Sequence, residues 1–115
     1  MPGIEKRAHF RRSLQADAAI ADVTGDGWNQ VQLLDISRSG VALISKEALE
    51  AGLSRALRFS LPDSAKRINV VGKVAHCTPH TYLGGYRVGI QFSRIHEDDI
   101  TLIEQFVSDA ALPAM

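Results

Sequence analysis

The sequence lacks a net charge, since its 13 lysine and arginine residues are balanced by 13 aspartate and glutamate residues. Proteins that bind nucleic acid without sequence preference normally carry a basic excess, because their affinity comes from counterions released by the phosphates. Without such an excess, we do not expect non-specific nucleic-acid binding. An anionic ligand must instead be held by a local cluster of cations.

Cysteines and long apolar runs are also scarce. Cys77 is the single cysteine, so no disulfide can form within the chain, which excludes a secreted scaffold built on disulfides. The first residues, MPGIEKRAHFRR, contain no apolar stretch of signal-peptide length. No run approaches the roughly 18 apolar residues that a membrane-spanning helix needs. We therefore expect a soluble cytoplasmic protein that does not insert into a membrane.

The common motifs of catalysis and metal binding are missing as well. The sequence has no glycine-rich phosphate loop, no serine–histidine–aspartate arrangement and no pattern of paired carboxylates. Cys77 follows His76, with His80 nearby, but a zinc site needs three or four ligands at workable spacing. This short cluster adjoins Pro79, which predicts a turn. We predict no enzymatic activity, no metal and no cofactor.

Apolar residues, by contrast, make up 45% of the 115 residues, which is enough for the core of one ordinary domain. Several stretches alternate apolar and polar residues with the period of two that is typical of half-buried strands. The clearest are 55–61, 68–75 and 86–92, and further β-rich stretches cover 15–23, 28–36 and 41–45. Six short strands favour closure into a small barrel, because closure removes exposed sheet edges.

The remaining segments predict turns and helices. Gly25-Asp26-Gly27 favours a tight hairpin turn, and 45–52 has the serine and glycine ends of a single helical turn. In 96–111, apolar residues recur at spacings of three and four after an acidic start, as in an amphipathic helix that packs on the barrel. The predicted chain is mainly β, with a flexible basic arm (1–13), a barrel (14–95) and this C-terminal helix.

Two short motifs and one strand carry chemical information together. The arm contains Arg7 and Arg11, four positions apart within EKRAHFRRS, and DISRSG occupies 35–40. Either motif alone is ordinary, as a solvated charged segment or as a turn. In this order, and followed by YRVGIQF at 86–92, they resemble the signature of the PilZ domain family. The resemblance spans about Lys6 to Phe92 and implies a six-stranded antiparallel PilZ-type β-barrel with a C-terminal α-helix.

The resemblance also implies a ligand, the bacterial second messenger cyclic di-GMP, bound on the outside of the barrel. The implied binding residues are Arg7, Arg11, Asp35, Ser37 and Gly40. Their chemistry suits the ligand, since an arginine fork can grip phosphate or guanine O6 and N7 and can stack on a purine. The carboxylate of Asp35 can accept hydrogen bonds from guanine N1–H and N2–H₂. Gly40 would permit close backbone approach and an unusual φ.

Residues beside the motifs are further candidates. Lys6, Arg12 and Arg38 could add charge, and Arg87 and Gly89 face outward on their strand. In this family the position of Lys6 influences whether one ligand molecule or a stacked pair is held, and here we favour the stacked pair.

We therefore predict a receptor that changes conformation on binding cyclic di-GMP and signals to an unidentified effector protein. One alternative is a degenerate PilZ-like adaptor that no longer binds the nucleotide. Another is a small nucleic-acid-binding barrel, which would need an aromatic strand face for base stacking that this sequence lacks.

Overall fold

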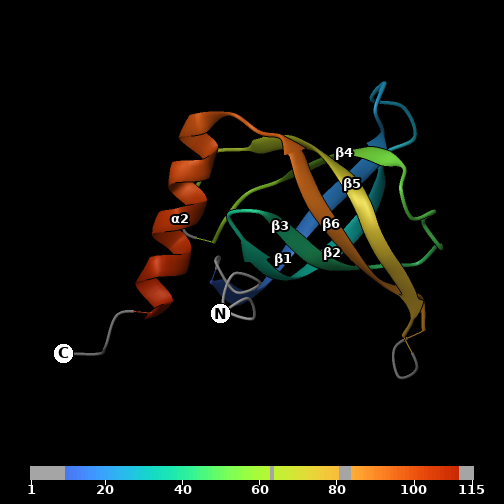
Figure 1. Ribbon diagram of the computed structural model, residues 1–115, viewed down its shortest axis with the longest axis horizontal. Coiled ribbons are helices and arrows are strands. Elements are labelled where there is room, and N and C mark those ends of the chain that lie inside the picture. The colour runs from blue at the N-terminus through green and yellow to red at the C-terminus, as the bar shows by residue number, and fades with distance from the viewer. Residues whose placement is uncertain (1–9, 63, 81–83, 112–115) are drawn as a thin grey trace, which may run out of the picture.

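The computed structural model of the chain describes residues 10–62, 64–80 and 84–111. Figure 1 shows a strongly curved sheet of antiparallel strands with a single helix beside it. The elements are β1 (Arg11–Asp22), β2 (Asn29–Ser37), β3 (Gly40–Ser45), β4 (Ser54–Phe59), β5 (Ile68–Pro79), β6 (Tyr86–Arg94) and α2 (Glu97–Ala111).

The sheet closes into a barrel in the order β1-β2-β3-β6-β5-β4, and β4 pairs with β1 to complete the ring. Every pairing is antiparallel. Closure satisfies the backbone hydrogen bonds that an edge strand would leave unpaired. The predicted fold class, a mainly β six-stranded barrel followed by one helix, is confirmed.

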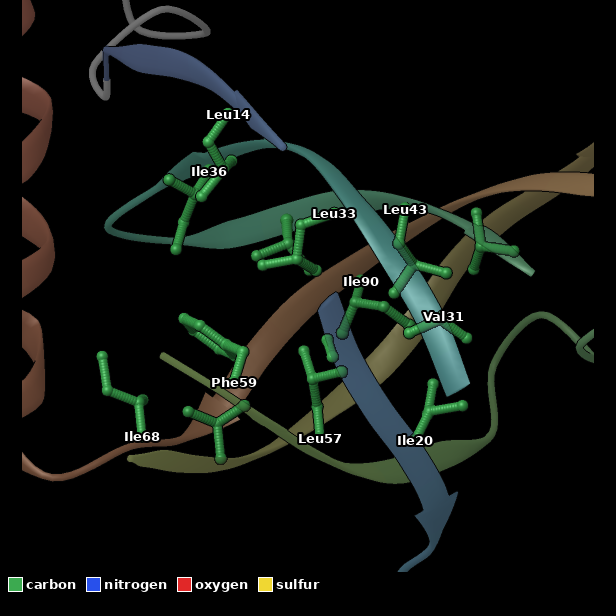
Figure 2. Close-up of a cluster of buried hydrophobic side chains, with 14 of the residues drawn as sticks. Leu14, Ile20, Val31, Leu33, Ile36, Leu43, Leu57, Phe59, Ile68 and Ile90 are labelled. Atoms are coloured by element: carbon green, nitrogen blue, oxygen red, sulfur yellow. The ribbon is translucent and has the colours of Figure 1, made fainter. Parts of the chain in front are cut away.

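Strand alternation separates the barrel interior from its outer face. In β5, for example, Ile68, Val70 and Val74 are buried, while Asn69 and Lys73 are exposed. Apolar side chains from β2, β3, β4 and β6 meet inside the barrel, as Figure 2 shows for Leu33, Leu43, Leu57 and Ile90. Because the interior is filled by side chains, a ligand can be accommodated only on the outer face.

Helix α2 lies beside the barrel and has its main contacts with β1 and β2 (Figure 1). Ile103 and Val107 are buried against the core, as the spacing of apolar residues predicts. Near the start of the helix, Lys66 Nζ lies 2.9 Å from Asp99 Oδ1. This contact with Asp99 raises the pKa of Lys66 above its ordinary value. Within the described residues, no helix has the length and apolar character needed to cross a bilayer.

The segment 45–52 is not the helical turn that the sequence predicts. The Leu49 backbone N–H donates to Cys77 Sγ at 3.4 Å, and the Gly52 N–H donates to the Val74 carbonyl at 2.8 Å. These N–H groups bond to β5 and not within a helix. The Leu49 side chain is buried in the core, which fixes the path of this segment.

Strand β1 begins at Arg11 and not at Leu14, the predicted start of the barrel. Arg11 pairs with Ser37 and Ser13 pairs with Asp35, so the long partner strand β2 supplies backbone partners that residue patterning does not reveal. The end of the predicted arm is therefore part of the barrel. Residues 1–9 lie outside the described residues.

The predicted hairpin turn after β1 is present. Gly25 and Gly27 have φ values of 87° and 73°, in the left-handed region that glycine adopts with little steric cost. Asp22 Oδ1 accepts hydrogen bonds from the Thr24 hydroxyl and from the Asp26 N–H. The bond from Thr24 lowers the pKa of Asp22, because it stabilises the ionised carboxylate.

Candidate ligand-binding face

Pairing of β1 with β2 brings the two sequence motifs together. Arg11 Nε donates to Asp35 Oδ1 at 2.7 Å, and Arg11 Nη1 donates to Ser37 Oγ at 3.2 Å. These residues are far apart in sequence, but the antiparallel register places Arg11 opposite Ser37. Three of the predicted binding residues therefore form one contact network on the outside of the barrel.

Ser37 also shapes the turn between β2 and β3. Its side chain is fully buried, and its Oγ accepts a hydrogen bond from the Ser39 N–H at 3.2 Å. The Ser39 carbonyl in turn accepts from the Phe92 N–H of β6 at 2.8 Å. The turn is thus held by a hydrogen bond to the Ser37 side chain and by a backbone hydrogen bond from β6.

Gly40 allows a close approach between β3 and β6. A Cβ atom at this position would lie 2.2 Å from the Ile90 carbonyl oxygen, a distance that real Cβ contacts do not reach. This close approach is between two strands, and the role predicted for Gly40 in approach to a ligand stays a prediction. The expectation of an unusual φ is wrong, because Gly40 is not among the glycines with a positive φ.

Strand β6 adds a second arginine to the network. Arg87 Nη2 lies 3.6 Å from Asp35 Oδ2, so the carboxylate of Asp35 is placed between Arg11 and Arg87. All three side chains are partly exposed, at 45% for Arg11, 46% for Arg87 and 20% for Asp35. These polar groups remain accessible to a ligand.

Next to this network, the imidazole of His76 lies over Gly89. The two residues are paired between β5 and β6, and a Cβ atom on Gly89 would be 2.3 Å from His76 Nε2. His76 is not among the binding residues predicted from the sequence, where its place next to Cys77 suggests only a metal ligand. The signal that could have placed His76 on this face is the alternation of side chains along β5, combined with the register of β5 against β6.

The residues of this face surround an open depression of about 340 Å³. Its lining includes Arg11, Asp35, Gly40, His76, Arg87 and Gly89. We call this candidate site the ligand-binding face. It combines two arginine side chains and one carboxylate with Gly40, which has no side chain, and with the imidazole of His76 over Gly89. This combination suits a flat ligand with both phosphates and hydrogen-bonding base edges.

Two other arginines that the sequence offers as candidate binding residues, Arg12 and Arg38, contact α2. Arg12 Nη1 donates to the Phe106 carbonyl at 2.6 Å, and its guanidinium lies 3.9 Å from the centre of the Phe106 ring. Arg38 Nη1 lies 3.3 Å from Glu104 Oε2. The structure does not bring Arg12 and Arg38 into the depression. Lys6 and Arg7 lie outside the described residues.

His76 and Cys77 are neighbours on β5 and take opposite directions, His76 toward Gly89 and Cys77 toward Leu49. Across residues 10–62, 64–80 and 84–111, no three His, Cys, Asp or Glu side chains are grouped closely enough to hold a metal ion.

Comparison with known proteins agrees with this geometry. The model of the PilZ domain family matches residues 5–109. This chain belongs to the PilZ domain family. The match includes every residue of the signature and nearly all of α2, so the family assignment made from the sequence is confirmed. No curated protein sequence matches this PilZ domain significantly.

Solved structures share its fold at low sequence identity. The Bacillus subtilis inhibitor of motility (MotI/DgrA) has a TM-score of 0.81 and 17% identity over 91% of this chain and 51% of its own. The PilZ domain of Escherichia coli YcgR, solved with c-di-GMP, has a TM-score of 0.73 and 12% identity over 90% of both chains. Borreliella burgdorferi PlzA, also in complex with c-di-GMP, has a TM-score of 0.67 and 18% identity over 92% of this chain and 43% of its own. This PilZ domain therefore spans about half the length of MotI and less than half of PlzA.

Proposed function

We propose that this PilZ domain is a receptor for cyclic di-GMP, a binding module without enzymatic activity, which passes its signal to an effector protein in the cytoplasm. The observation that carries the proposal is the Arg11–Asp35–Ser37 network next to Arg87, with room for a ligand beside it. Similar folds in YcgR and PlzA were solved with c-di-GMP, which supports the same ligand here.

On binding, groups of the ligand would replace Arg11 and Asp35 as each other's partners. The carboxylate of Asp35 can accept from guanine N1–H and N2–H₂, while the Arg11 fork turns to guanine O6 and N7 or to a phosphate. The pairing between Arg11 and Asp35 holds both groups in place before the ligand arrives, which reduces the entropy lost on binding. Charge-assisted hydrogen bonds of this kind contribute roughly 1.5–3 kcal/mol each.

Gly40 and the imidazole would define the floor and one wall of the site. Gly40 carries no side chain, so a purine ring can approach β3 closely, and the His76 ring, which lies over Gly89, would stand beside the purine. We propose that Lys6 and Arg7 complete the cationic side of the site from the arm. A stacked pair of ligand molecules would use the additional charge of Lys6.

Helix α2 offers a route for the signal. Arg11 faces the ligand, whereas the next residue, Arg12, contacts Phe106 of α2. Arg38, in the turn of the second motif, contacts Glu104. A shift of β1 or of this turn on ligand binding would therefore change the position of α2 and the surface that an effector reads.

The competing function is a PilZ-like adaptor that does not bind the nucleotide. In that case the Arg11–Asp35 pair would be only a structural ion pair of the β1–β2 hairpin. Binding calorimetry separates the two functions, because the receptor alone produces heat with cyclic di-GMP.

The test is calorimetry of the purified chain with cyclic di-GMP, cyclic di-AMP and GTP. We expect preference for cyclic di-GMP, and we expect Asp35→Ala to weaken binding and to reduce the discrimination for guanine. Arg67→Ala, at an exposed position outside the ligand-binding face, is a matched control that should bind normally. No heat and no competition at high micromolar ligand would contradict the receptor function.

A further inference from the structure

A second hollow lies elsewhere on the outer face of the barrel. None of its lining residues belongs to the ligand-binding face. There, Ala19 of β1 is flanked by Gln30 of β2 and Arg58 of β4. Its neighbours Ala18 and Ile20 are buried, so the short Ala19 side chain points outward and leaves depth between longer side chains. The hollow measures about 350 Å³.

An aromatic–arginine stack forms one wall. The Arg58 guanidinium lies 4.0 Å from the centre of the Trp28 ring. Such stacking fixes the guanidinium plane and leaves its N–H edges available to an acceptor. Trp28, Arg58 and Arg67 all line the hollow, which we call the Trp28 groove.

The positive charge in the Trp28 groove is not neutralised by its surroundings. Within the part of the chain that the structure describes, no carboxylate lies at ion-pair distance from Arg58 or Arg67. Asp17 is the acidic residue of the lining, and it pairs with neither arginine. By contrast, Arg11, Arg38 and Arg87 each have a carboxylate partner.

We infer that the Trp28 groove docks an acidic segment of a partner protein. A glutamate or aspartate carboxylate of that segment would bind the Arg58 and Arg67 forks, and its aliphatic atoms would pack on Trp28 and Ala19. Tryptophan and arginine are the residue types that contribute most at protein interfaces. A protein partner is favoured over nucleic acid, because the chain has no basic excess.

The inference goes beyond binding of cyclic di-GMP, since it places a partner in a hollow that shares no lining residue with the ligand-binding face. The two proposals can fail independently. Asp35→Ala should weaken nucleotide binding and leave peptide docking unchanged. Arg58→Gln and Arg67→Gln should weaken peptide docking and leave nucleotide binding unchanged.

Trp28 is the only tryptophan of the chain, so its fluorescence reports directly on occupancy of the groove. We would titrate the full chain with capped hexaglutamate, hexaserine and hexalysine peptides and with an oligothymidylate. The expected result is a saturable change with hexaglutamate alone, which weakens as salt is raised because the charges are exposed.

The variants Arg58→Gln and Arg67→Gln should each weaken hexaglutamate binding by about fivefold. Lys46→Gln removes an exposed cation outside the groove and should have no effect. Arg67→Gln keeps the test interpretable even if Arg58→Gln alters the fluorescence baseline, because Arg67 does not stack on the indole. Absence of a saturable change at millimolar peptide, equal affinities in the arginine variants and Lys46→Gln, or tighter binding of the oligothymidylate would each overturn the inference.

Discussion

The ligand-binding face and the contact between β1 and α2 depend on two neighbouring residues with different surroundings. Arg11 belongs to the ligand-binding face, and Arg12 contacts α2. Arg11 points to the outer face, where it is accessible and paired with Asp35. Arg12 is half-buried, donates to the Phe106 carbonyl and stacks on that ring. Strand alternation sends adjacent arginines to opposite sides. One basic segment thus supplies a candidate binding group and a group that contacts α2, and chemical type alone does not distinguish them.

The largest effect is expected from substitution of the two glycines that line the ligand-binding face. Gly40→Ala places a Cβ atom against the backbone carbonyl of Ile90, so β3 and β6 must separate. We expect the free energy of unfolding to fall by about 3 kcal/mol or more in urea denaturation.

Gly89→Ala is the matched variant. The three atoms nearest to its new Cβ belong to the exposed His76 ring, which can rotate away, so the loss of stability should stay below about 1 kcal/mol. The methyl group would nevertheless occupy the ligand-binding face and weaken binding of cyclic di-GMP. Equal losses of stability in the two variants would refute the role assigned to the close approach at Gly40.

Substitution of the neighbouring arginines tests the comparison directly. Arg11→Ala should weaken nucleotide binding at least about tenfold, which corresponds to about 1.4 kcal/mol, with little change in stability. Arg7→Ala should behave in the same way if the arm completes the site. Calorimetry and urea denaturation measure the two quantities on the same samples.

Arg12→Ala should show the opposite pattern. Loss of its hydrogen bond and its ring contact should lower the free energy of unfolding by about 1–2 kcal/mol and leave nucleotide affinity nearly unchanged. If Arg12→Ala weakened binding as strongly as Arg11→Ala, the division between the two sides of β1 would be incorrect.

Hydrogen exchange sharpens the comparison over the whole chain. We expect amides of residues 5–10 to exchange fast without ligand and slowly with it, because phosphates between Arg7 and Arg11 would order the arm. Amides in 68–75 should change little. A change in α2 would support the route through Arg12, whereas equal protection of the arm in both states would exclude ordering of the arm as the switch.

The smallest effect is expected from pH. The pKa of Lys66 is raised by its contact with Asp99, so the stabilisation is fully present below the ordinary lysine value of 10.5 and is lost as pH rises through the folded-state pKa. The urea midpoints of the wild type and Lys66→Met should therefore differ at pH 9 and converge at higher pH. A constant difference would show that this ion pair does not anchor α2.

Much of the fold was predictable, because it depends on local periodicity. Alternation located the strands, and three- and four-residue spacing located the helix, with Ile103 and Val107 on its buried face. The exception is segment 45–52, where local helix signals were outweighed by contacts to β5. A short helix gains little from its own hydrogen bonds, so burial of Leu49 determines its path.

The sequence by itself determined the strand pattern, the family and the identity of the signature residues Arg11, Asp35, Ser37 and Gly40. Only the tertiary structure decided what these groups contact. It placed His76 over Gly89, turned Arg12 and Arg38 toward α2, and stacked Arg58 on Trp28, where none of the described carboxylates pairs with it. The physical reason is that a period of two assigns side chains to a face, whereas their neighbours across the sheet depend on register and on closure of the barrel.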